Sequence, residues 1–247
     1  MGLIRLLLAI SVITAHSSSI FGLTFVQSQI AVEIFFMISG FYMALILSEK
    51  YIKKSDYRLF ITNRLLKIFP TYWFVLLVSI IFQVSYSYFH QNSSSVFAFF
   101  DPRYPLHPFT FITFVISNLI IIGQDLLLFF GLNVNTGTLF FTSNFRLFKP
   151  EIFNFFFVVQ AWTLSLEIMF YFIAPLFNRF KNKYLLIIMS LSLGLRLFFY
   201  SRGLNHDPWN YRFFPTELIF FLGGILMYRF YLKRSEEHTS ELQSRQV

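Results

Sequence analysis

Two ionisable side chains lie inside the first apolar segment of the chain, where Arg5 is followed eleven positions later by His16. On an α-helix, eleven residues return to within about 20° of the same face and rise roughly 16 Å. One helix face would then carry a cation near one membrane surface and an imidazole near mid-depth. An imidazole suits proton transfer near neutral pH, whereas the structural alternatives are a buried hydrogen-bonded histidine and a snorkelling arginine.

Further polar residues interrupt the second and third apolar segments. Glu33 lies near the outer end of its predicted helix and needs a partner, for which an imidazole on the adjacent antiparallel helix is a natural candidate. Ser39 and Gly40 are small and favour close helix packing. Arg64 and Lys67 are three residues apart and share a face at the cytoplasmic surface. Two such cations suit a phosphate-bearing ligand, although the spacing alone favours an ordinary membrane anchor.

The second half of the chain contains two more carboxylates in apolar surroundings. For Glu167 the structural interpretation is a hydrogen bond to a neighbouring helix, and for Glu217 it is a favourable position near a helix start. Ser165 lacks the Gly-x-Ser-x-Gly context of a hydrolase. His206 and Asp207 make a poor metal site because two ligands are too few, so we expect no metal.

The composition indicates that membrane-spanning helices position these residues. Of 247 residues, 56% are apolar and 13% are charged, against about 25% charged in soluble domains. This composition is typical of an integral membrane protein. Seven apolar runs are long enough to cross about 30 Å of hydrocarbon, which predicts an all-α, polytopic transmembrane helix bundle of six to seven spans. The runs are 3–22, 30–48, 69–89, 109–132, 155–177, 184–200 and 213–231.

The net charge of +8 is expected in cytoplasmic loops, and no nucleic-acid partner is expected. The run 109–132 is the uncertain element because it contains Asn118, Gly123, Gln124 and Asp125. If it returns without crossing, 11 Lys and Arg residues lie inside and 5 outside; if it crosses, the counts are 10 and 6. The first arrangement is favoured, and both place the amino terminus in the cytoplasm. Cysteine is absent, which excludes disulfides and thiolate catalysis.

The last residues break this pattern. From Arg234 to Ser244 the chain turns abruptly polar and is similar to the in-frame translation of a sequencing adapter. We therefore expect 234–247 to be a non-native tail, excluded from functional reasoning, with the natural chain continuing beyond Lys233. The alternative is a solvated acidic tail.

Four blocks of the sequence together resemble the acyltransferase 3 family of multi-span membrane enzymes. Arg5 and His16 match its R-x10-H signature. Residues 31–41 look like its G-V-D-x-F-F-x-x-S-G-F block, with Ala and Glu replacing Gly and Asp. Residues 64–73 are similar to R-x-x-R…P-x-Y-W, and residues 162–175 to W-S-L-S-x-E…F-Y…P. Because the four blocks occur in the family's order over about 170 residues, the resemblance is specific.

The resemblance implies a function. The family O-acetylates cell-surface glycans and other secreted molecules, takes acetyl-CoA or another acyl-CoA as donor, and needs no tightly bound cofactor. It implies an enzyme of the bacterial plasma membrane, with the glycan acceptor and the lipid bilayer as partners. The family domain has about ten spans, so residues 1–233 would be a partial acyltransferase 3 domain.

The resemblance also implies roles for individual residues. His16 would act as general base on the acceptor hydroxyl or accept the acyl group itself. Glu33 would orient the imidazole, and Glu167 is a second candidate. Arg64 and Lys67 would hold the phosphates of the donor.

Arg5 would be a further phosphate contact beside those two cations, and a lysine at position 67 loses the bidentate fork of the family's arginine. A polytopic transporter or flippase for a glycan-related substrate is the alternative, because charged residues inside spans also line permeation paths. That alternative predicts internal repeats, and the sequence contains none that is evident.

Overall fold

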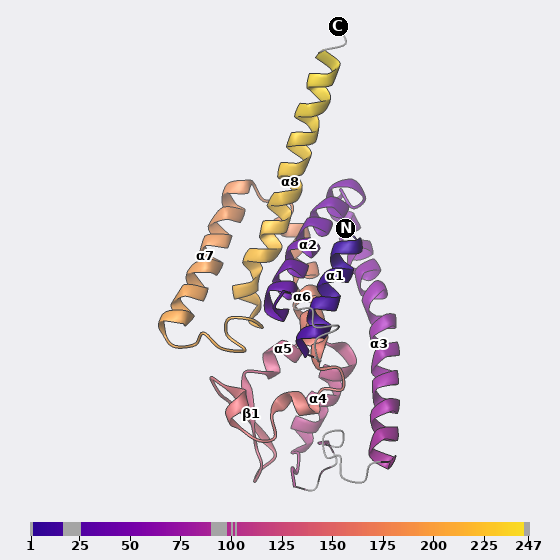
Figure 1. Ribbon diagram of the computed structural model, residues 1–247, viewed down its shortest axis with the longest axis vertical. Coiled ribbons are helices and arrows are strands. Elements are labelled where there is room, and N and C mark those ends of the chain that lie inside the picture. The colour runs from indigo at the N-terminus through magenta and orange to yellow at the C-terminus, as the bar shows by residue number, and fades with distance from the viewer. Residues whose placement is uncertain (1, 17–25, 90–97, 100, 102, 245–247) are drawn as a thin grey trace. The chain divides into compact units, whose positions relative to one another are not determined.

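The computed structural model describes the chain except residues 1, 17–25, 90–97, 100, 102 and 245–247. The described residues form eight α-helices and a two-stranded hairpin (Figure 1). The helices are α1 (Gly2–His16), α2 (Ser28–Glu49), α3 (Tyr57–Phe89), α4 (Pro108–Ile120), α5 (Gln124–Leu127), α6 (Trp162–Phe177), α7 (Asn182–Ser201) and α8 (Phe214–Ser244). The strands are β1 (Phe130–Asn133) and β2 (Thr138–Phe141), and single 3-10 turns are η2 (Lys54–Asp56), η3 (Phe145–Leu147), η4 (Ile152–Phe155) and η5 (Val159–Ala161).

Helices dominate because apolar segments in lipid must satisfy their backbone hydrogen bonds internally. Among the described residues, four helical segments are long and apolar enough to cross a membrane: Ser28–Glu49, Lys54–Tyr86, Val159–Phe177 and Asn182–Ser201. Two shorter apolar helices cover Leu3–Ala15 and Pro108–Ile120. Each of the seven predicted runs contains a helix. The predicted all-α membrane bundle is confirmed, and the short hairpin is an addition to it.

The chain forms two compact units, each of which we describe by itself. The first contains Met1–Arg58, Phe170–Phe198 and Phe214–Val247. Its centre is the packing of α2 on α8, where the ring of Phe221 stacks on Phe36 at 4.6 Å and on Phe170 at 4.3 Å between centroids.

Two glycines allow α2 and α8 to pack this closely. A Cβ added to Gly40 would overlap the carbonyl oxygen of Phe221, and one added to Gly224 would overlap that of Met37. Only glycine leaves room for such backbone-to-backbone contact between membrane helices. The predicted packing role of Gly40 is confirmed.

The second unit contains Leu59–Met169 and Phe199–Phe213. Phe114 and Phe155 are fully buried in an apolar cluster of this unit and stack at 4.5 Å between ring centroids. The antiparallel hairpin pairs Phe130 with Phe141 and Asn133 with Thr138, and it belongs to the same unit. Aromatic packing therefore supports the non-helical part of the chain.

The run 109–132 does not form one spanning helix. Helix α4 has 13 residues and rises about 20 Å, short of the roughly 30 Å of a bilayer core. It ends where Ile121 and Gly123 take positive φ angles of 65° and 89°. The amide of His107, just before α4, donates to the carbonyl of Gly137, just after β1, at 3.0 Å. Both ends of the run therefore lie together, which corresponds to the arrangement that enters and returns.

The connection 201–213 lies at this same end of the second unit. The indole of Trp209 donates to the carbonyl of Ser143 at 2.8 Å, and its ring packs edge-on against Phe129 and Phe199 at 4.9 Å between centroids in each pair. These contacts join three parts of the second unit, which we call the cap: the described residues of 98–107, the segment 133–161 and the connection 201–213.

Candidate active site

Helix α1 carries the first predicted pair. Its described backbone is helical from Gly2 to His16, so Arg5 and His16 keep the helical spacing that the sequence predicts. The guanidinium carbon of Arg5 lies 4.7 Å from the centroid of the Tyr42 ring on α2. Its Nε is buried and has no hydrogen-bond partner among the described residues. The side chain of His16 lies outside the described part of the structure.

Glu33 has a partner that the sequence did not predict. Its Oε1 accepts a hydrogen bond from Nη2 of Arg196 on α7 at 2.7 Å and one from Nε2 of Gln29 at 3.3 Å. The sequence predicts a histidine of α1 as the partner of Glu33. The described partners are an arginine of α7 and Gln29, and the side chain of His16 is not among the described residues. A lone arginine in an apolar run was the available signal, because such a charge requires an acidic partner.

Arg196 also contacts a second carboxylate. Its Nη2 lies 3.4 Å from Oε1 of Glu217, in the first turn of α8 as predicted, and its guanidinium carbon lies 4.9 Å from the Phe220 ring centroid. Glu217 is 0% exposed, and neither of its oxygens has a hydrogen-bond partner among the described residues. Ser192 donates to the carbonyl of Pro215 at 2.7 Å and so joins α7 to the start of α8. Two carboxylates therefore share one guanidinium inside the first unit.

The two predicted phosphate ligands lie on α3 in the second unit. Arg64 is half-buried, with its guanidinium carbon 6.0 Å from the Phe60 ring centroid, whereas Lys67 is exposed. Both are on one helix and three residues apart, as predicted. Arg5 belongs to the first unit, so the structure describes it separately from this pair.

The block around Glu167 holds the interrupted segment 108–132. Glu167 is half-buried on α6. Its neighbour Ser165 is fully buried, donates to Oδ1 of Asp125 at 2.5 Å and accepts from the amide of Gly123 at 3.0 Å. Sequence reasoning treated Ser165 only as a nucleophile and missed this link, because 40 residues separate it from Asp125. The hydroxyl satisfies polar groups where the helix is interrupted.

The side chain of Asn118 forms hydrogen bonds with further backbone groups near this interruption. Its Nδ2 donates to the carbonyls of Phe114 at 2.9 Å and Phe155 at 2.8 Å, and its Oδ1 accepts from the amide of Phe157 at 3.0 Å. The hydroxyl of Tyr72 on α3 donates to the Asn118 carbonyl at 2.5 Å. Tyr72 and Ser165, from two different sequence blocks, thus bind the same buried segment.

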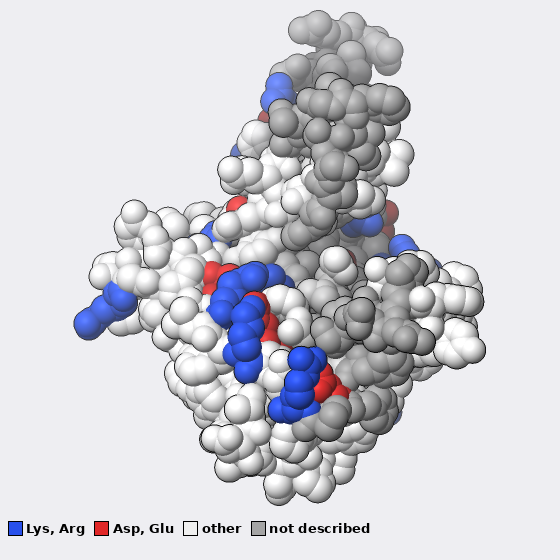
Figure 2. All heavy atoms as spheres, turned by 60° about the horizontal axis from the view of Figure 1, so that its bottom comes forward, with Lys and Arg blue, Asp and Glu red and all other residues white. Residues whose placement is uncertain are grey.

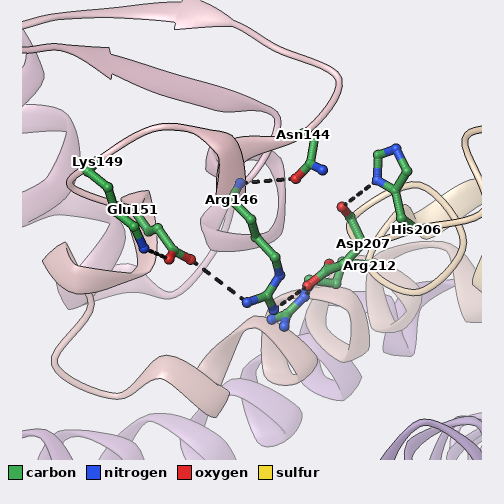
Figure 3. A network of polar contacts seen from close by, with 7 residues as sticks. All are labelled: Asn144, Arg146, Lys149, Glu151, His206, Asp207 and Arg212. Carbon is green, nitrogen blue, oxygen red and sulfur yellow. Dashed lines mark hydrogen bonds and ion pairs between the residues drawn. The ribbon is translucent and has the colours of Figure 1, made fainter.

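A network of charges crosses the cap (Figure 3). The carboxylate of Asp207 accepts from Nη2 of Arg146 at 3.0 Å and from Nε of Arg212 at 2.7 Å. Arg212 in turn lies over the Trp162 ring at 4.4 Å. Glu151 pairs with Lys149, and its Oε2 lies 3.8 Å from Arg146. Figure 2 shows basic and acidic side chains side by side on the face turned forward.

The carboxylate of Asp207 is therefore used in ion pairs with Arg146 and Arg212. The ring of His206 contacts the backbone oxygen of Asp207 at 3.0 Å, and within the described ranges no three His, Cys, Asp or Glu residues form a group that could hold a metal. Elsewhere on the cap, the Arg103 guanidinium, which bonds to Asp101 at 2.6 Å, lowers the pKa of that carboxyl. The cap is therefore a surface of paired charges.

The fold and the ionisable residues define a polytopic helical membrane protein with charges inside its bundle, a class that includes enzymes and transporters. A family model described as an acyltransferase domain, that of the acyltransferase 3 family, matches residues 1–241. The chain belongs to this family and is a membrane acyltransferase. No curated protein and no solved structure matches the chain. Family membership favours the enzyme over the transporter alternative.

Proposed function

We propose that this acyltransferase moves an acetyl or other acyl group from acyl-CoA to a hydroxyl of a cell-surface polysaccharide or similar acceptor. The observation that carries the proposal is the family match over residues 1–241, because it fixes acyl transfer as the reaction. The described positions of Arg5, Glu33 and Arg64 on apolar helices support it, since charges there are costly without a function.

In the proposed reaction, His16 accepts the proton of the acceptor hydroxyl as the oxygen attacks the thioester carbon. The new C–O bond forms, the C–S bond breaks, and the imidazolium returns the proton to the departing thiolate. Alternatively, an imidazole nitrogen of His16 first attacks the thioester carbon, the C–S bond breaks and CoA leaves; the acceptor hydroxyl then attacks the acyl group, the C–N bond breaks and the imidazole takes up the hydroxyl proton. Base catalysis of this kind contributes about 10²- to 10⁴-fold.

Two carboxylates are candidates to orient the imidazole. The hydrogen bonds that Glu33 accepts from described residues both end on Oε1, so Oε2 can accept another. Glu167 on α6 is the second candidate. A carboxylate in this role fixes the tautomer and stabilises the imidazolium.

The donor would bind from the cytoplasm. Exposed Lys67 and half-buried Arg64 on α3 would contact its phosphates. The extended pantetheine arm would then carry the thioester into the bundle.

The protein would lie in the bacterial plasma membrane with its amino terminus in the cytoplasm. The return of the run 109–132 supports the arrangement with 11 basic residues inside and 5 outside, which follows the positive-inside rule. The cap would then face the acceptor side.

This orientation predicts the labelling of single cysteines, and the chain has none of its own. A membrane-impermeant maleimide should label Asn135→Cys and Asn205→Cys in intact cells, because both positions are exposed on the cap. It should label Lys54→Cys, also exposed, only after permeabilisation. Labelling of position 54 in intact cells would contradict the orientation.

The function is tested by acyl transfer in membranes that contain the protein. We expect radiolabel from acetyl-CoA to enter the glycan fraction, with continued release of CoA thiol over many turnovers only when both protein and acceptor are present. Movement of the glycan across the membrane without thiol release would instead support a flippase.

A further inference from the structure

Arg196 joins two carboxylates from two other helices of the first unit. One nitrogen, Nη2, lies 2.7 Å from Oε1 of Glu33 on α2 and 3.4 Å from Oε1 of Glu217 on α8. The side chains of Arg196 and Glu33 are 19% and 15% exposed, and that of Glu217 is 0% exposed. Glu217 thus contacts the guanidinium from the fully buried side of the cluster, while Glu33 contacts it from the partly exposed side.

Stability is a poor reason for such a cluster. Desolvation of the charges offsets much of their attraction, and apolar residues of similar volume would pack as well. The contacts of α2 with α8 are already provided by the close approach at Gly40 and by the stacked rings of Phe36 and Phe221. The cluster therefore contributes less to the packing of α2 on α8 than to the orientation of its own polar side chains.

The geometry fixes one half of the Glu33 carboxylate. Arg196 and Gln29 both donate to Oε1, and no described residue donates to Oε2. A carboxylate held in this way has a defined plane and presents one oxygen to a further donor. Partners that orient a reacting group in this manner have large effects on reactivity in other sites.

We propose that Arg196 is a positioning residue for acyl transfer and acts through Glu33. It holds Oε1 so that Oε2 accepts its hydrogen bond from the reacting groups in a fixed direction, and Glu217 holds Arg196 in turn. This role rests on the function proposed above. It assigns Arg196 and Glu217 to the reaction, although neither touches the reacting atoms.

The test is a double-mutant cycle on kcat with Glu33→Gln, Arg196→Gln and the combined variant. If Arg196 acts through Glu33, each single substitution should lower kcat about 10- to 100-fold, and the combined variant should be no slower than the slower single variant. The KM for acyl-CoA should change less than about twofold, because uniform donor binding is untouched. Losses that multiply in the combined variant would overturn the proposal.

Arg196→Lys keeps the proposal testable if Arg196→Gln does not fold, because lysine retains the charge but not the fork. We expect it to recover part of kcat. Arg229→Gln is the matched control, since Arg229 is a half-buried arginine of the same unit that donates to the carbonyls of Phe180 and Asn178 at 2.8 Å. It should lower the unfolding temperature in detergent without a selective loss of kcat.

Two further results separate the proposals. A wild-type protein that releases no CoA thiol with any acceptor would refute the proposed function. An active wild-type protein whose Arg196→Lys and Arg196→Gln variants retain the wild-type kcat would refute only the role of Arg196.

Discussion

His16→Ala is expected to abolish measurable acyl transfer while leaving membrane insertion intact. Loss of a general base lowers kcat by about 10²- to 10⁴-fold, and loss of a residue that carries the acyl group would lower it further. Insertion should persist because alanine is a good helix former and removes a polar group from an apolar helix. Radiolabelled acetyl transfer in membranes measures the effect, with the amount of inserted protein held equal.

His206→Ala is the matched control for the loss of an imidazole. Its ring contacts the backbone oxygen of Asp207 in a loop of the cap, and we assign it no part in the reaction. We expect wild-type kcat for this variant. Wild-type activity of His16→Ala, in protein that inserts normally, would rule out both proposed roles of this histidine.

Periodicity and hydropathy were sufficient to predict the helices but not their partners. The sequence predicts a histidine as the partner of Glu33 because α1 is the neighbour of α2 in the sequence. The described donors to its carboxylate are Gln29 and Arg196, and Arg196 on α7 lies 163 residues further along the chain. Such contacts depend on which helices become neighbours, which a single sequence does not state.

The interruption of the run 109–132 was partly predictable. Asn118, Gly123 and Asp125 mark it as unusual for a spanning helix, and the positive φ angle of Gly123 explains the glycine. The hairpin after it was missed because the apolar residues of β1 read as the end of a span. The link from Asp125 to Ser165 was missed because nothing local indicates a contact across 40 residues.

Two of the four family blocks have a structural explanation that differs from direct chemistry. Tyr72 from the third block bonds to Asn118, and Ser165 from the fourth bonds to Asp125, so both hold the buried end of α4 and α5. A family pattern can thus preserve the walls of a site as well as its reacting groups. The chemistry is better sought in the charged positions Arg5, His16 and Glu33.

The double variant Arg64→Ala/Lys67→Ala is expected to raise the KM for acetyl-CoA by at least about 100-fold with little change in kcat. Each hydrogen bond to a charged group contributes about 1.5–3 kcal/mol, and about 1.4 kcal/mol corresponds to a tenfold change. The KM for acetylpantetheine, which carries the same thioester without phosphates, should not change. Initial rates with both donors measure this difference directly.

Two further variants test whether Arg64 and Lys67 in particular bind the donor phosphates. Arg58→Ala removes an exposed cation near the start of the same helix and should leave both KM values unchanged. Lys67→Arg restores the bidentate fork of the family pattern and should lower the KM for acetyl-CoA or leave it unchanged. If the double variant raises the KM for acetylpantetheine as much as that for acetyl-CoA, Arg64 and Lys67 do not read the phosphates, and the ordinary anchoring role of these cations is the better explanation.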